Sequence, residues 1–135
     1  MARLIDSSVF IALERRGEPL HALQAVLSDQ PFALASISVS ELLLGVHRAD
    51  TDEQRSKRLE YVNEIIQGMS VLPFDLESAW THARLEFQLA AIGRPIGPND
   101  MIIAATALTH GYSVLTHNLR HFERVSGLTV EVPKL

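Results

Sequence analysis

The segment that most restricts the fold is an apolar run, Met101–Leu108, which follows the tetrapeptide Gly97–Asp100. A helix that is apolar around most of its circumference must be buried on most sides, so other elements have to pack around it. Proline suits the first turn of a helix, because its fixed φ fits there and its missing N–H would be unpaired anyway. Pro98 therefore predicts the start of a buried helix, with Asp100 in or near its first turn, beside the interior.

Segments with the pattern of strands alternate with segments with the pattern of helices along the whole chain. The first kind is short and apolar, and the second has apolar residues at intervals of three and four. We expect strands at Ala2–Ile5, Phe32–Ile37, Met69–Phe74, Tyr112–Thr116 and Leu128–Val132. We expect helices at Ser8–Arg15, Glu18–Ser28 and Leu76–Ile92, besides the one that Pro98 begins. We also expect an apolar helix Leu42–His47 that Ser38–Glu41 opens, and a long solvated helix in which the charged patch Asp50–Arg58 runs into Leu59–Gln67. This order predicts a single domain over residues 1–135 with an α/β fold of three layers, in which helices flank a mostly parallel sheet of roughly five strands.

Composition excludes several classes of protein. The 135 residues carry a formal charge of −4, which argues against a protein that wraps nucleic acid by bulk positive charge but leaves a local basic groove open. No segment approaches the roughly 20 continuous apolar residues of a membrane span, and Asp6 comes too early for a signal peptide. Because there is no cysteine, disulfides and thiolate metal sites are excluded. We expect a cytoplasmic protein that does not enter a membrane.

Four polar side chains flank the predicted strands at the edge where the strands end. Asp6 ends the first strand, and Asn118 follows the fourth. Glu41 lies in the first turn of the helix after the second strand, and Asp100 begins the helix that leads to the fourth. Sites in open parallel sheets form outside the carboxyl ends of the strands. We therefore expect these four side chains, from distant segments, to converge.

Three carboxylates and an amide at one edge suit a hard divalent cation. Mg²⁺ binds oxygen ligands, keeps several waters and uses a few carboxylates together with substrate phosphate. Without a cation, two carboxylates about 5 Å apart repel each other by about 3 kcal/mol at an effective dielectric constant near 20. A metal ion would neutralise them and could lower the pKa of a bound water for attack on a phosphoryl group. Asp6, Glu41 and Asp100 are thus the candidate metal ligands.

Each of these residues also has an ordinary structural explanation. Asp6 could cap the helix that follows it, and Asp100 could interact with the helix dipole. Glu41 could form a capping box with Ser38, and Asn118 could form a turn. None of these explanations accounts for all four residues at one predicted edge of the sheet.

Four segments resemble, in order and spacing, the motifs of PIN-domain nucleases, and most of all those of VapC-type toxins from bacterial toxin–antitoxin pairs. These segments are Leu4–Val9, Ser38–Leu42, Pro98–Ala107 and Leu115–Phe122. The resemblance implies a PIN-like fold and an endoribonuclease that depends on Mg²⁺, with Mn²⁺ as a substitute, and that hydrolyses RNA and so inhibits translation or growth. It implies that Asp6, Glu41 and Asp100 bind the metal. It also implies a cognate VapB-like antitoxin that blocks the site, and a homodimer that could join a higher toxin–antitoxin assembly.

Asn118 departs from the fullest form of this pattern, in which many PIN nucleases carry a fourth acid. An amide oxygen can still bind a metal or its water, but it brings no charge. We therefore expect one tightly held ion, with Asn118 as the fourth member of the catalytic set. Thr116 and Ser7 are expected to hydrogen-bond to Asp6 and to orient it.

The remaining polar and aromatic residues carry weaker signals. His117 and His121 have the spacing of a zinc pair on a helix, but surface histidines near a phosphate path are the favoured interpretation. Trp80 and Phe87 lie seven residues apart on one predicted helix, and we expect them in the core or in a dimer contact. Some arginines could hold phosphates or could be ordinary solvated charges. These are Arg15, Arg16, Arg94, Arg120 and Arg124.

Two other functions compete with the nuclease. In a phosphotransferase of the haloacid-dehalogenase type a strand-end aspartate is the nucleophile, but that site needs a second acid where Ser8 stands. It also needs a nearby lysine, whereas Lys57 and Lys134 lie in a charged helix and near the terminus, so this class is set aside. The second competitor is a catalytically weak PIN-like binding module that acts only within a protein complex. Asn118 keeps that alternative open.

Overall fold

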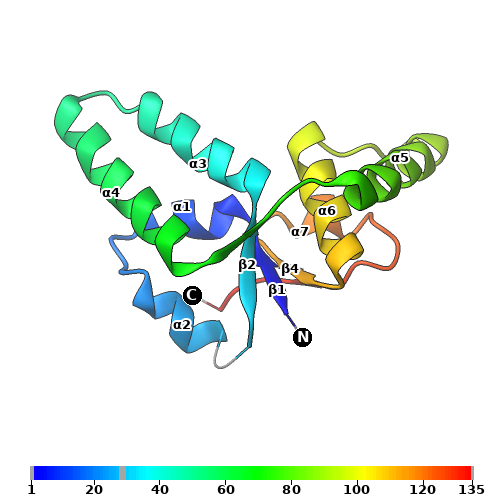
Figure 1. The fold of residues 1–135 in the computed structure, drawn as a ribbon, viewed down its shortest axis with the longest axis horizontal. Coiled ribbons are helices and arrows are strands. Elements are labelled where there is room, and N and C mark those ends of the chain that lie inside the picture. The colour runs from blue at the N-terminus through cyan, green and yellow to red at the C-terminus, as the bar shows by residue number, and fades with distance from the viewer. Residues whose placement is uncertain (1, 28–29, 135) are drawn as a thin grey trace.

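The computed structural model describes residues 2–27 and 30–134. Within these residues the chain forms a parallel sheet of five strands in the order β3-β2-β1-β4-β5. The strands are β1 (Arg3–Ile5), β2 (Phe32–Ala35), β3 (Ser70–Leu72), β4 (Ser113–Leu115) and β5 (Val130–Glu131). The helices are α1 (Ser7–Arg15), α2 (His21–Leu27), α3 (Ser36–His47), α4 (Asp52–Gly68), α5 (Leu76–Ala91), α6 (Pro98–His110) and α7 (Leu119–Phe122). The predicted α/β fold with a parallel sheet is confirmed (Figure 1).

Each face of the sheet packs against its own set of helices. Successive side chains of a strand point to opposite faces. Leu4 and Ala33 belong to a hydrophobic cluster with residues of α5, α6 and α7, whereas Ile5 and Leu34 belong to a second cluster with residues of α1 to α4. Figure 1 shows the two groups of helices on either side of the central strands. The three predicted layers are present, and burial on both faces explains why the inner residues Leu4–Ile5, Ala33–Ala35 and Val114–Leu115 are apolar.

The buried helix predicted from Pro98 is α6. Pro98 lies in its first turn, Gly97 is its N-cap, and Gly111 ends it in the left-handed conformation with φ of 72°. The helix packs along α5 on one side and contributes to the cluster beneath the sheet on the other. Its buried residues are Met101, Ile103, Ala104, Ala105, Thr106 and Ala107. Because this packing fixes the whole helix, it also fixes where the first turn and Asp100 lie.

The register of the parallel strands aligns the segments that follow them. Ile5 of β1 pairs with Leu115 of β4, and the backbone N–H of Asp6 donates to the carbonyl oxygen of Leu115 at 2.9 Å. Thr116 therefore lies at the level of Asp6. This alignment brings the carboxyl ends of β1 and β4 together at one edge of the sheet, although more than 100 residues separate them in the sequence.

The boundary between β2 and the next helix differs from the prediction. β2 ends at Ala35, and α3 begins at Ser36, two residues before Ser38, with which the predicted helix opens. Ile37 and Val39, which look like strand residues, pack from α3 against the clusters on the two faces of the sheet. Tertiary packing therefore overrides their β propensity. As a result, Glu41 lies in the second turn of the helix and not in the first.

Two further differences concern short helices. α2 begins at His21 and not at Glu18, and Ser28, the predicted end of that helix, lies outside the described residues. α7 was not predicted, because four residues are too short to show a helical period. Its Phe122 is fully buried and anchors it.

In the part of the chain that the structure describes, no helix is both long and apolar enough to cross a membrane.

Candidate metal centre

Asp6 follows β1 and is 2% exposed. It occupies the N-cap position of α1, but its side chain makes no capping hydrogen bond. Instead, Asp6 Oδ2 accepts hydrogen bonds from Ser8 Oγ at 2.7 Å and from Thr116 Oγ1 at 2.8 Å. Side-chain capping, the structural alternative for this residue, is therefore wrong, and the carboxylate is oriented from two segments that meet at the edge of the sheet.

The two hydroxyl groups that orient Asp6 are themselves fixed by the backbone. Thr116 Oγ1 accepts from the N–H of Asn118 at 2.9 Å, and Ser8 Oγ accepts from the N–H of His117 at 3.1 Å. A hydroxyl that accepts from an N–H has its own proton left to donate, here to the carboxylate. The contact predicted for Thr116 is present.

Ser7 does not contact Asp6 as expected. Its Oγ donates to Glu41 Oε1 at 3.1 Å, and the neighbouring Ser8 takes the expected place. The reason is that α1 begins at Ser7, so one turn of the helix directs the two hydroxyls to different acids.

Two donors from distant segments hold Glu41. Besides Ser7 Oγ at its Oε1, Asn99 Nδ2 lies 3.4 Å from its Oε2. The predicted capping box is wrong. The N-cap of α3 is Ala35, and Ser38 is buried inside the helix, its Oγ without a partner among the described residues.

Burial raises the pKa of Glu41, its two hydrogen bonds lower it, and the negative charges of Asp6 and Asp100 raise it again, with a net increase.

Asp100 lies in the first turn of α6, where it can also interact favourably with the helix dipole. Its Oδ2 is 2.7 Å from Nδ1 of His121, which lies in α7. Burial raises the pKa of Asp100, the hydrogen bond with His121 lowers it, and the charge of Asp6 raises it, again with a net increase. The three acids are therefore close enough to act on one another.

The fourth predicted residue, Asn118, is exposed at the start of α7. Its backbone N–H contacts Thr116, so it lies at the same edge as the acids. Its side chain makes no capping hydrogen bond, and its φ of −97° is not that of a left-handed turn. The role of Asn118 in the catalytic set stays a prediction.

The donor set is that of a hard cation: carboxylate oxygens held by hydroxyl, amide and imidazole groups. As the side chains lie, no three His, Asp or Glu residues of the described chain are arranged to hold a metal ion together.

Comparison with known proteins identifies the family. A family model described as a PIN domain matches residues 3–128. The chain belongs to the PIN-domain family. Ribonuclease VapC1 of Rickettsia felis is 40% identical to it over 134 residues, which cover 96% of this chain and 95% of that protein. At this level of identity over nearly the whole length, the PIN domain is a VapC-type ribonuclease toxin.

Two other comparisons agree. The tRNA(fMet)-specific endonuclease VapC of Salmonella typhimurium is 33% identical over 105 residues, which cover 78% of this chain and 77% of that protein. A chain in the crystal structure of DNA-bound VapBC from Salmonella typhimurium is 28% identical, with a TM-score of 0.85 over 98% of both chains. The PIN-like fold expected from the sequence motifs is thereby confirmed.

The histidines of this PIN domain do not form a zinc pair. His117 precedes α7, whereas His121 lies within it and contacts Asp100. His117 is half-buried, and its Nε2 has no hydrogen-bond partner among the described residues. The contact between His121 and an acid was not predicted. The only signal was the place of His121 in a family motif, since α7 itself shows no periodic pattern.

Trp80 and Phe87 are not core residues, since each is 76% exposed. Helical spacing alone does not tell which side of a helix faces the core. Here Ser78, Leu85 and Leu89 form the buried side of α5. A dimer contact, the other expectation for these two residues, stays a prediction.

Replacing Asp100 by Asn should increase the free energy of unfolding at pH 7 in EDTA by about 1 kcal/mol, because a half-buried charge next to Asp6 is removed. The pKa of Asp100 is raised in the folded protein, so the folded state binds the proton more tightly than the unfolded chain does. The wild type should therefore gain stability as the pH falls through the folded pKa toward the ordinary value of 3.8, and the variant should lack this gain.

Urea denaturation at several pH values measures this difference. Asp50→Asn, at an exposed position outside the site, is the matched control. If Asp100→Asn instead lowers stability at pH 7 in EDTA, the residue serves mainly the helix dipole.

Proposed function

We propose that this PIN domain, acting as one domain over residues 1–135, hydrolyses RNA phosphodiester bonds with a Mg²⁺ ion held by Asp6, Glu41 and Asp100, and that Mn²⁺ can substitute. The observation that carries the proposal is electrostatic. Burial raises the pKa of Glu41 and of Asp100, and the charge of Asp6 raises both further, although hydrogen-bond donors contact each of these acids. A cation shared by the three carboxylates would relieve that repulsion.

The residues around the acids have distinct parts in the proposed reaction. When bound, a divalent ion supplies charge that polarises a phosphoryl oxygen and lowers the pKa of a bound water. Ser8 and Thr116 hold Asp6 in one orientation, so its carboxylate needs no reorganisation. Asn118 offers an uncharged amide at the same edge, which suits a water or a phosphate oxygen. With no fourth charge, we propose one ion and not two.

We also propose a VapB-like antitoxin as the partner of this toxin. The support is that a similar chain in Salmonella typhimurium was crystallised as VapBC. The antitoxin would block the edge that carries the acids. Free toxin would cleave RNA in the cytoplasm and so inhibit translation or growth, and the pair could form a higher assembly.

Purified protein should cleave RNA in Mg²⁺ and should lose that activity in EDTA. Asp6→Asn should lower the rate at least about a hundredfold, because several kcal/mol of charge stabilisation would be lost with the ion. Asp50→Asn, which removes an exposed charge outside the site, should cleave like the wild type. The measurement is the initial rate on a labelled structured RNA.

Cleavage that resists both EDTA and the Asp6 substitution would come from a contaminant and would contradict the nuclease proposal. If wild-type protein leaves the RNA uncleaved in Mg²⁺ but forms a stable complex with the antitoxin, the alternative of a catalytically weak binding module is favoured.

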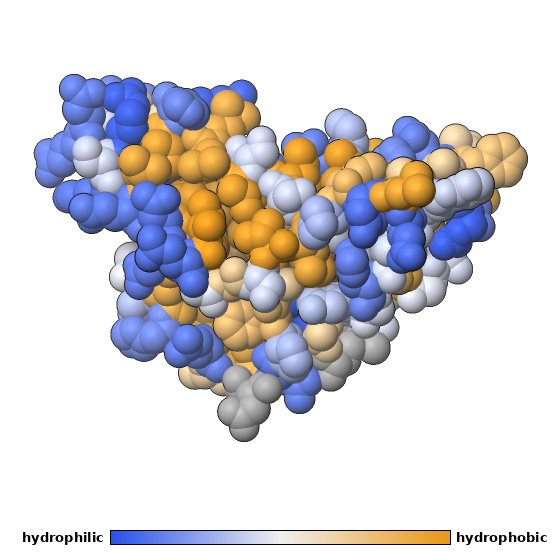
Figure 2. Space-filling model, viewed as in Figure 1, coloured by the Kyte–Doolittle hydropathy of each residue, from blue (hydrophilic) through white to orange (hydrophobic). Residues whose placement is uncertain are grey.

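A homodimer through α5 is the third part of the proposal. Leu76, Trp80 and Phe87 are 75%, 76% and 76% exposed and lie on the side of α5 that faces away from its buried residues. Figure 2 shows hydrophobic surface reaching the outer end of this helix. Contiguous exposed apolar residues of this size are unusual on a monomer and mark an interaction surface.

The double variant Trp80→Glu/Phe87→Glu should be a monomer at concentrations at which the wild type is a dimer, because four carboxylates would enter the interface. Leu59→Glu is the matched control, since Leu59 is an exposed apolar residue of α4. Sedimentation velocity measures the outcome. A wild-type protein that sediments as a monomer, or a variant that still dimerises, would remove α5 as the interface.

A further inference from the structure

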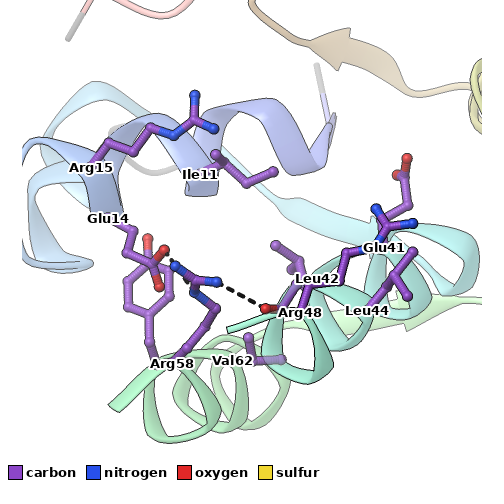
Figure 3. A pocket seen from close by; sticks show the side chains of 11 residues that line it. Ile11, Glu14, Arg15, Glu41, Leu42, Leu44, Arg48, Arg58 and Val62 are labelled. Atoms are coloured by element: carbon purple, nitrogen blue, oxygen red, sulfur yellow. Dashed lines mark hydrogen bonds and ion pairs between the residues drawn. The ribbon is translucent and has the colours of Figure 1, made fainter. Parts of the chain in front are cut away.

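A pocket of about 350 Å³ lies beside the acids, between α1, α3 and α4. Glu41 lines one end of it, so the pocket and the candidate metal centre share a residue. Ile11, Leu44 and Val62 give it apolar walls (Figure 3). This volume is at the lower end of the range that small organic ligands occupy, and it is enough for one nucleotide.

Two arginines at the pocket have no partner among the described residues. Arg15 comes from α1 and Arg48 from the end of α3, on different sides of the pocket (Figure 3). Within the described residues neither guanidinium makes a hydrogen bond or an ion pair. By contrast, the third lining arginine, Arg58, donates to Glu14 Oε1 at 3.2 Å and to the carbonyl oxygen of Gly45 at 2.8 Å. Arg58 is therefore part of the wall, and the other two are available to a ligand.

We propose that this pocket binds the nucleotide next to the scissile phosphodiester, with its phosphate between Arg15 and Arg48 and its base against the apolar wall. The inference rests on the proposed function, because a strand whose phosphodiester lies at the acids must continue into the space that Glu41 borders. Guanidinium groups match phosphate in charge and in hydrogen-bond geometry. Bases of single-stranded RNA are free to enter such a pocket.

The pocket also explains how an acidic protein holds RNA. With a formal charge of −4, the whole molecule repels a polyanion, so affinity has to come from a few well-placed cations. The guanidinium groups of Arg15 and Arg48, which line the same pocket as Glu41, supply them. The pocket would then influence which nucleotide flanks the cleaved bond.

The test measures equilibrium binding of a fluorescent single-stranded RNA hexanucleotide of random sequence to the Asp6→Asn protein in Mg²⁺, which separates binding from cleavage. Arg15→Gln and Arg48→Gln together should raise Kd at least about tenfold. The slope of log K against log salt should become shallower by about 0.7 for each phosphate that the substituted side chains no longer neutralise. Arg84→Gln, on an exposed position of α5, is the control for the removal of a positive charge.

A second variant tests the shape of the pocket. A Cβ added at Gly45, which lines it, would meet only Arg58 Cδ at 3.9 Å, so the helix tolerates a side chain there. Gly45→Leu should fill the pocket and weaken RNA binding about tenfold. Its thermal unfolding shows whether the fold is kept.

The outcomes separate this inference from the proposed function. If the arginine variants bind RNA as tightly as the control while wild-type protein cleaves RNA, the pocket inference is wrong and the nuclease proposal stands. If the protein neither binds nor cleaves RNA, both fail. Variants that keep RNA affinity but no longer bind the antitoxin assign the pocket to the protein partner and overturn the inference.

Discussion

Electrostatic repulsion among Asp6, Glu41 and Asp100 is the interaction that the rest of this structure has to oppose. Burial raises the pKa of Glu41 and of Asp100, and the negative charge of Asp6 adds to both increases. The fold can hold them together because each is carried by an element fixed elsewhere: the central strand β1, the helix α3 and the buried helix α6. Packing on both faces of the sheet supplies the free energy that this arrangement costs.

The groups that contact the acids keep the site negative. Ser7, Ser8, Thr116 and Asn99 donate hydrogen bonds but carry no charge, so they orient the carboxylates without neutralising them. His121 is the one titratable donor in this set of contacts among the described residues. Such an arrangement favours an external cation over an internal salt bridge.

The fold and the convergence of the acids could be predicted because they depend on patterns along the chain. Alternating strands and helices indicate a parallel sheet, and the carboxyl ends of its strands define one edge. The contacts around the acids could not be predicted, because they depend on where helices begin. α1 begins at Ser7 and α3 at Ser36. As a result, Ser8 makes the contact with Asp6 that was expected of Ser7, and Glu41 has no capping box. Which side of α5 faces solvent likewise depends on tertiary packing and could not be predicted from helical spacing alone.

The central claim is that the three acids hold one divalent ion, and calorimetric titration with Mn²⁺ tests it most directly. Because the pKa values of Glu41 and Asp100 are raised, binding at a pH at which these acids are still partly protonated should release protons, which titrations in buffers of different ionisation enthalpy detect. The account predicts one Mn²⁺ per chain, proton release, and the disappearance of both in Asp6→Asn. Saturable binding that is unchanged in Asp6→Asn, or no binding by the wild type, would contradict it.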